Sequence, residues 1–161
     1  MSRFLILFLA FFASASFAEI YDIDNDKIYL SVDKGEKINA SLFKVCEEKN
    51  VSFAWINGIG AICNPEIGYF DIESKSYVKK IFNGDFELVS LIGNMTFKDN
   101  QRFIHTHITF TDTSFHAYGG HLFDCEISAA GEFIIIIGNN RVDREYSQEV
   151  GLALWNCNIH G

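Results

Sequence analysis

The sequence predicts an α+β domain, of the broad α/β class, in which a mostly antiparallel sheet carries one principal helix. Most of the chain consists of short stretches with strand character, and the hairpin-length connections between them favour antiparallel pairing. One clear helical pattern, over residues 36–50, lies between two of these stretches. The 161 residues are 48% hydrophobic and 15% aromatic, which is enough to bury the core of a single domain.

The first half of the chain is predicted to run from strand to helix and back to strand. Residues 27–32 form the first strand. In residues 36–50, apolar side chains recur at spacings of three and four, as on the buried face of a helix. Residues 51–56 form an apolar strand, and residues 57–61 carry two glycines, for which we expect a bend or bulge between strands. Residues 66–71 and 76–82 then form a hairpin.

The second half is predicted to consist of strands joined by turns. Residues 86–92 are apolar on both faces apart from Glu87 and Ser90, as expected of a central strand. A turn is expected at residues 129–131, and residues 139–148 are polar and expected at the surface. Further strands are predicted at residues 104–111, 122–128, 132–137 and 150–157.

Residues 1–18 have the features of a signal peptide. Arg3 gives a positive start, residues 4–13 are an apolar run too short to span a bilayer comfortably, and Ser16 and Ala18 are small residues where a signal peptidase cleaves. We expect cleavage before Glu19, so that residues 19–161 form one domain with its core in residues 28–157. The mature protein would be periplasmic or secreted, with no membrane anchor. A buried N-terminal helix or an uncleaved anchor is the alternative.

The charge of the chain opposes binding to nucleic acid. The formal net charge is −8, from 13 Lys and Arg against 21 Asp and Glu. Cleavage after residue 18 removes one Arg and no acid, which leaves 12 bases against 21 acids and a charge of −9. Affinity for a phosphate backbone is largely a cationic effect, so DNA is an unlikely partner.

Four cysteines leave the disulfide pattern open. An even number in an exported chain permits two disulfides, with three connectivities, and buried free thiols are the equal alternative. The residues concerned are Cys46, Cys63, Cys125 and Cys157.

The stretch 102–122 says most about function, because it holds four of the five histidines. His105 and His107 are two apart in a predicted strand, so both imidazoles point to the same, polar side. His121 follows a Gly-Gly pair and begins the next strand, which can bring it alongside. Three imidazoles are the usual protein share of an open zinc or similar divalent site. Surface or hydrogen-bonded histidines are the alternative, and His116, in a predicted loop, is the alternative third ligand.

Two charged residues are candidates for supporting roles. Glu87 lies in an apolar strand, where a buried carboxylate needs a charge, a metal or a hydrogen-bond network as partner. We expect it to act beside the metal as a supporting partner or general acid/base, and a solvated strand end is the alternative. Arg102 is a candidate to pair with an anionic ligand.

The chain resembles the PPC (plants and prokaryotes conserved) domain family, over roughly residues 28–138. The resemblance rests on GEKINASLFKVCEEKNV in the predicted helix, NGIGA at the glycine bend and GDFELVSLIGNM in the central strand. It also includes the H-x-H pair at His105 and His107 and GGHL ending at Leu122, all in the family's order and spacing.

This resemblance implies a mostly antiparallel α/β domain that assembles as a homotrimer, with metal bound by clustered histidines in some bacterial members. It also implies a fold similar to acetolactate decarboxylase, whose zinc is held by an H-x-H pair and one later histidine. Plant members are nuclear proteins that carry an AT-hook, and bacterial members are often labelled DNA-binding by analogy. This chain has no such Arg-Gly-Arg-Pro hook.

Three functional hypotheses follow. The first is an exported, trimeric PPC-domain protein that holds a divalent metal, with zinc as the first choice, at His105, His107 and His121. Such a protein would bind a small polar ligand, and the stronger version of this hypothesis is that it also transforms the ligand. The second is a DNA-binding protein, and the third is a structural trimer without metal. No G-x-S-x-G setting or Cys-His neighbour defines a reaction, so whether the protein is an enzyme stays open.

Overall fold

The computed structural model describes residues 20–157, and the expected signal peptide lies outside them. The chain forms one helix and nine strands in this range. The elements are β1 (Ile20–Asp24), β2 (Lys27–Asp33), α1 (Ile38–Glu48), β3 (Ala54–Asp71), β4 (Ser76–Ile81), β5 (Asp85–Lys98), β6 (Gln101–Thr111), β7 (Ala117–Ile137), β8 (Asp143–Ser147) and β9 (Leu152–Asn156).

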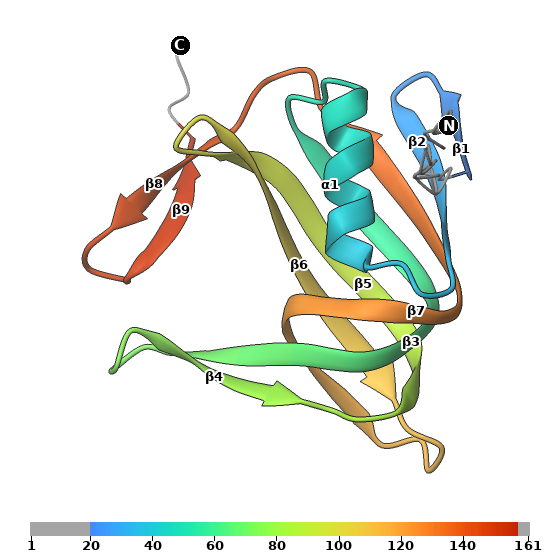
Figure 1. The fold of residues 1–161 in the computed structure, drawn as a ribbon. Helices are drawn as coiled ribbons and strands as arrows, with labels where there is room; N and C mark the ends of the chain where they lie inside the picture. Colours follow the sequence, from blue (N-terminus) through green and yellow to red (C-terminus); the bar gives the residue numbers. More distant parts are fainter. Residues whose placement is uncertain (1–19, 158–161) are drawn as a thin grey trace, which may run out of the picture.

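All nine strands belong to one sheet, and the predicted fold class is confirmed. Its main path is β1-β2-β7-β3-β5-β8-β9, with β4 on β3 and β6 between β5 and β7. Every pair is antiparallel except the short contact of β5 with β8. Because β3, β5, β6 and β7 pair in a closed ring, the long strands bend strongly, and α1 packs across them (Figure 1).

The long strands correct two of the predicted connections. The glycine segment 57–61 does not separate two strands: it lies inside β3, which continues through a bulge between Gly58 and Gly60. Gly60 has φ +154°, and a Cβ there would lie 2.4 Å from the Ala130 carbonyl oxygen on β7. The turn expected at residues 129–131 is likewise the interior of β7, because the two strands bend together here.

The C-terminal segment differs from the prediction as well. Residues 139–148 lie at the surface or are half-buried, as expected, but they also contain a strand that was not predicted, β8, which forms a hairpin with β9. This hairpin joins the sheet through the pairing of Phe97 with Asp143 and of Lys98 with Arg144. The predicted last strand, 150–157, corresponds to β9. The N-terminal strand β1 was not predicted.

The helix covers one face of the sheet and defines the core. Its buried side chains face apolar residues of β2, β3, β5, β6 and β7. Asn39 binds the helix to two strands: its amide nitrogen donates to the carbonyls of Leu122 (3.4 Å) and Phe123 (3.1 Å), and its carbonyl oxygen accepts from Thr106 Oγ1 at 2.8 Å. These contacts fix β6 and β7 next to each other at the level of the histidines.

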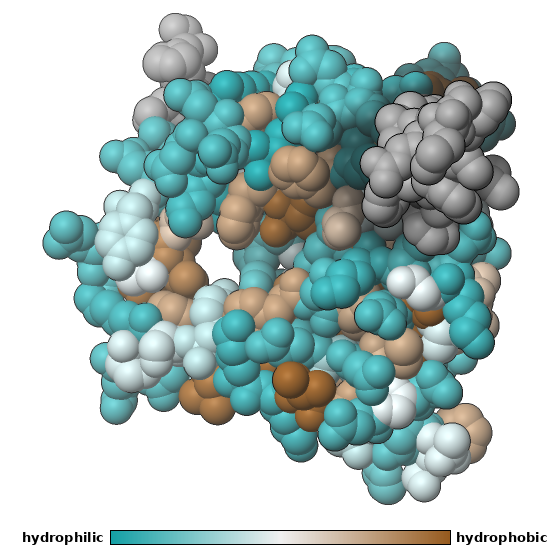
Figure 2. Space-filling model, in the orientation of Figure 1, coloured by the Kyte–Doolittle hydropathy of each residue, from teal (hydrophilic) through white to brown (hydrophobic). Residues whose placement is uncertain are grey.

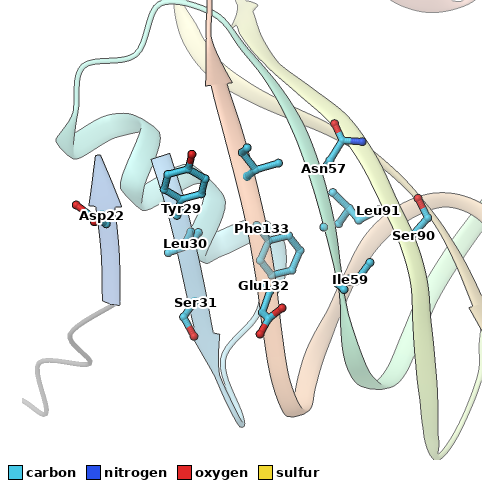
Figure 3. Close-up of a pocket in the computed structure, with 12 residues that line it drawn as sticks. Asp22, Tyr29, Leu30, Ser31, Asn57, Ile59, Ser90, Leu91, Glu132 and Phe133 are labelled. Carbon is cyan, nitrogen blue, oxygen red and sulfur yellow. The ribbon is translucent and has the colours of Figure 1, made fainter. Parts of the chain in front are cut away.

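No helix of residues 20–157 covers the opposite face of the sheet. Figure 3 shows a pocket on it, across β1, β2, β7, β3 and β5, with Asp22, Tyr29, Ile59 and Ser90 among its lining residues. The pocket has a volume of about 720 Å³. Apolar side chains on these strands are exposed on this face, including Trp55, Ile92 and Ile136.

The four cysteines are free in the structure. Cys46 and Cys125 are buried, and burial raises the pKa of both thiols to about 12, so they behave as apolar core residues. Within residues 20–157, no helix combines the length and apolar character needed to span a bilayer.

Ile108→Asp tests the two faces of β6. Ile108 is 3% exposed in the core, whereas the adjacent Thr109 points outward. A buried aspartate without a partner should lower the free energy of unfolding by about 3–5 kcal/mol, and Thr109→Asp by less than about 1 kcal/mol. Urea unfolding measures both values. Equal effects of the two substitutions would contradict this orientation of the strand.

Candidate metal centre

Strand parity and pairing bring three histidines together. His105 and His107 alternate with buried Thr106 and Ile108 on β6, so the imidazoles leave the helix-covered face. In the register of β6 with β7, His107 is the direct partner of His121. Directly opposed residues of an antiparallel pair have neighbouring side chains. The arrangement predicted from the sequence is therefore present.

Two glycines permit the close packing next to this pair. A Cβ on Gly119 would lie 2.8 Å from the Ile108 carbonyl oxygen, and one on Gly120 would lie 2.8 Å from the Gly68 carbonyl oxygen. Both distances are shorter than real Cβ contacts, so any side chain here would push β7 away from β6 or β3. The Gly-Gly pair thus has a packing role that determines where His121 lies.

The three rings form a compact triangle. Ring centroids are 5.1 Å apart for His105 and His107, 5.0 Å for His105 and His121, and 5.5 Å for His107 and His121. One ring nitrogen from each residue lies within 4.8 Å of the other two. His105 Nε2 and His107 Nε2 approach to 3.2 Å.

All three imidazoles favour the neutral form. Burial lowers the pKa of His105 to about 4, with further lowering by His121, Arg144 and His107. Burial also lowers the pKa of His121 to about 4, helped by His107, Lys79 and Arg144. The pKa of His107 is lowered by burial alone. At neutral pH the cluster therefore offers unprotonated nitrogens, the form that binds metals.

These residues fit a divalent transition metal. Two nitrogens about 2.0–2.1 Å from a tetrahedral ion are about 3.3 Å apart, close to the separation of the His105 and His107 Nε2 atoms. His121 Nδ1 is buried and has no hydrogen-bond partner among the described residues. A buried nitrogen in this setting, beside two converging imidazoles, fits a bound ion as its partner.

Arg144, which the sequence analysis missed, reaches the cluster from β8. Its Nη2 lies 3.2 Å from His105 Nδ1 and donates to Asn94 Oδ1 at 2.9 Å, and its Nε donates to Thr96 Oγ1 at 2.8 Å. Nη1 donates to the Ala153 carbonyl at 2.8 Å. Asn94 and Thr96 are buried polar residues in an apolar strand. Polar residues at such positions in the sequence indicate that a hydrogen-bond donor from another element packs against them.

Tyr77 reaches the cluster from the other side. Its ring lies on β4, 4.9 Å from the ring of His121, with Phe123 against its edge. The site thus lies between the β3–β4 and β8–β9 hairpins. The hairpins also meet where Lys75 Nζ donates to the Gln148 carbonyl at 2.7 Å, and Figure 2 shows an opening between them.

A small pocket adjoins the cluster at His107. It has a volume of about 230 Å³ and is lined by Ser90, Thr109, Gly119 and Gly120, among others. The hydroxyl groups of Ser90 and Thr109 lie there beside apolar Ile92, so the space next to the histidines suits a small molecule with a polar group.

The other candidate site residues are not brought to the cluster. Glu87 is exposed at the far end of β5, paired with Thr111, on the order of 15 Å along the strand from the partner of His107. Its expected role beside the metal does not fit this position; the solvated strand end does. Arg102 has the opposite parity on β6 from His105, and it donates to the Val51 carbonyl and to Asn50 Oδ1.

His116 lies in the loop, as predicted. It is exposed, and its Nδ1 is 3.4 Å from Asp112 Oδ2. The turn is organised by Asp112, which accepts hydrogen bonds from the backbone of Ser114 and His116 and from the Tyr118 hydroxyl. His121, and not His116, is therefore the third member of the cluster.

Together these features define an α+β sheet domain that presents a three-histidine cluster of metal-binding geometry. Comparison with known families gives this class a name. A family model of the Plants and Prokaryotes Conserved (PCC) domain, abbreviated PPC above, matches residues 24–139. The chain belongs to this family. No curated protein matches it.

Solved structures agree with the family. A candidate DNA-binding protein from Bacteroides thetaiotaomicron is 30% identical, with TM-score 0.83 over 86% of this chain and 96% of that one. A PPC protein from Pyrococcus horikoshii is 33% identical, with TM-score 0.75 over 84% and 94%. A metal-containing protein from Archaeoglobus fulgidus is 33% identical, with TM-score 0.75 over 86% and 97%. Acetolactate decarboxylase from Bacillus subtilis is less similar, at TM-score 0.47.

Neutral burial of the cluster predicts an acid-sensitive stability of the metal-free protein. The folded pKa values of His105 and His121 are lower than in the unfolded chain, so the unfolded state takes up protons first as the pH falls below 6.5. Their contribution is complete above that pH and is lost toward about pH 4. Because both rings are partly solvated, we expect a loss on the order of 1 kcal/mol per histidine.

Urea unfolding with a chelator at pH 7 and pH 5 measures this loss. A variant with both His105→Asn and His121→Asn should lose less stability over this interval than the wild type. His116→Asn, which changes an exposed histidine, should behave as the wild type. The same pH dependence in the double variant and the wild type would contradict neutral burial of the cluster.

Proposed function

We propose that this chain is a metal-binding protein of the PPC family, which uses His105, His107 and His121 as ligands of one divalent transition metal. The observation that supports this best is the convergence of three imidazole nitrogens within 4.8 Å. Their low pKa values and the orphaned His121 Nδ1 support the same conclusion. The Archaeoglobus fulgidus relative, described as metal-containing, adds weight to it.

Zinc is the first candidate for the metal. Imidazole ligands suit zinc, nickel, copper and iron, and a site of three neutral nitrogens leaves at least one position for water or another ligand. The pocket of about 230 Å³ beside His107 could hold a small molecule at that position. A metal there would supply Lewis-acid chemistry, and we propose binding of a small polar ligand without assigning a reaction.

Metal content of purified variants tests the site. The wild type should carry about one ion per chain, and His105→Ala with His107→Ala should reduce it to background, because two of three ligands are lost. His116→Ala is the matched control and should keep full content. Inductively coupled plasma mass spectrometry gives the metal, and circular dichroism confirms folding. A folded double variant with full metal content would refute the site; a metal-free wild type would favour the structural alternative.

We also propose export and self-association. The signal-like N-terminus supports cleavage before Glu19 and a periplasmic or secreted location. The sheet face with exposed Trp55, Ile92 and Ile136 supports assembly, because apolar side chains on an uncovered sheet need a partner surface. The family resemblance points to a homotrimer in which copies of the chain cover this face.

Native mass spectrometry of the expressed protein tests both proposals. The protomer should have the mass of residues 19–161, and the assembly should have about three protomer masses. Ile92→Lys, on the exposed face, should shift the assembly toward monomer, whereas Val78→Lys, exposed on the edge strand β4, should not. A retained N-terminus would contradict export, and a monomer at micromolar concentration would contradict the trimer.

DNA binding is the second candidate, favoured by the description of the Bacteroides thetaiotaomicron relative. The formal charge of −8 opposes it, because nonspecific affinity comes from cations that neutralise phosphates. We expect no retardation of duplex DNA in a gel shift at physiological salt with protein at about 10 µM. Sequence-selective binding at that salt would make DNA binding the leading function.

A further inference from the structure

Arg144 carries a positive charge that no acid neutralises in the described part of the chain. Its four hydrogen-bond contacts are to Thr96, Asn94, the Ala153 carbonyl and His105, all neutral groups. No ion pair with an Asp or Glu is formed by this guanidinium among residues 20–157. A partly buried cation in such a setting attracts an anion.

In the described part of the chain, no Asp or Glu makes a hydrogen bond or ion pair with the three clustered histidines either. Within residues 20–157, the polar contacts of the three imidazoles are with one another and with Arg144. Metal-ligating histidines usually donate their second N–H to a carboxylate or carbonyl. Here a guanidinium takes that place at His105. Loaded with a divalent ion, the centre would bring two positive charges next to Arg144, with neutral ligands only.

The proton on His105 links metal binding to Arg144. Nδ1 accepts a hydrogen bond from Arg144 Nη2 at 3.2 Å, which places the proton of a neutral imidazole on Nε2. Nε2, however, is the atom that faces His107 and would bind the metal. A metal bound at Nε2 would require the proton on Nδ1, where it would face an N–H of Arg144, donor against donor. This contact would then be lost, and one N–H of Arg144 would become available next to His105.

We propose that the ligand of this centre is a small oxyanion, which places one oxygen at the open metal position and a second oxygen on Arg144. This inference rests on the function proposed above and assigns the chemical class of its ligand. Two oxygens on one atom, as in a carboxylate or a phosphate, can bridge a metal and a neighbouring guanidinium. A hydroxide has one oxygen and cannot make this bridge, so Arg144 would keep only its neutral partners.

Cobalt-loaded protein provides the test, because Co²⁺ at a three-histidine site absorbs visible light and responds to a change of ligand. The wild type is titrated with acetate and, separately, with inorganic phosphate, at constant ionic strength in chloride. Either anion should change the spectrum with saturation, and neutral acetamide should not. The two titrations show which oxyanion the site prefers.

Variants then assign the anion to Arg144. Arg144→Gln should weaken anion binding about tenfold to a hundredfold and leave the Co²⁺ content unchanged, because the charged hydrogen bond is lost but no metal ligand is. Arg144→Lys, which keeps the charge but not the planar group, should bind with intermediate affinity and serves if the glutamine variant does not fold. Arg141→Gln is the control, since Arg141 pairs with Asp143 and Asn100 and not with the clustered histidines of the described chain.

The outcomes separate the two proposals. A wild type that binds no Co²⁺ overturns the metal centre, and the oxyanion proposal falls with it. A wild type that binds Co²⁺ but shows the same spectrum with acetate, phosphate and acetamide overturns the oxyanion proposal alone. So does a folded Arg144→Gln or Arg144→Lys variant that binds both anions as tightly as the wild type.

Discussion

The pairing of β6 with β7 is the constraint on which the site depends. It sets His107 opposite His121, and it is possible only because Gly119 and Gly120 carry no side chain. Asn39 secures the pairing from the helix side, through Thr106 between the two β6 histidines and through the carbonyl next to His121. One amide thus connects the core to both strands of the site. A site held on paired strands is more rigid than one held on loops.

Next to the histidines, β5 carries two polar residues that find their hydrogen-bond partner on the β8–β9 hairpin. Asn94 and Thr96 are buried in β5, and a buried polar group without a partner costs free energy. Arg144 binds both of them, so its guanidinium attaches the β8–β9 hairpin to β5 in addition to the two residue pairs. The residue that supplies charge at the histidines is therefore also the residue that anchors the hairpin.

Local pattern predicted most of the elements, though not β1 or β8, and the three histidines, because strand parity and a Gly-Gly pair act over a few residues. Arg144 and Tyr77 could not be found this way, since they arrive from other hairpins whose positions depend on the whole sheet. Glu87 and Arg102 were assigned from residue type: Glu87 lies at the wrong end of its strand, and Arg102 has the wrong parity. The bends at Gly60 and in β7 were taken for breaks, because a bulge and a turn use the same residues.

The three histidines come from one short stretch of chain, and this has a consequence for the order of assembly. Closing the segment between His107 and His121 costs little conformational entropy, because only residues 108–120 lie between them. Pairing Arg144 with His105 requires a far longer loop and a formed β5. Early in folding, the imidazoles can therefore come together in the β6–β7 hairpin before the Arg144 guanidinium reaches them. A metal bound at that stage would already be in place when the β8–β9 hairpin packs against the sheet.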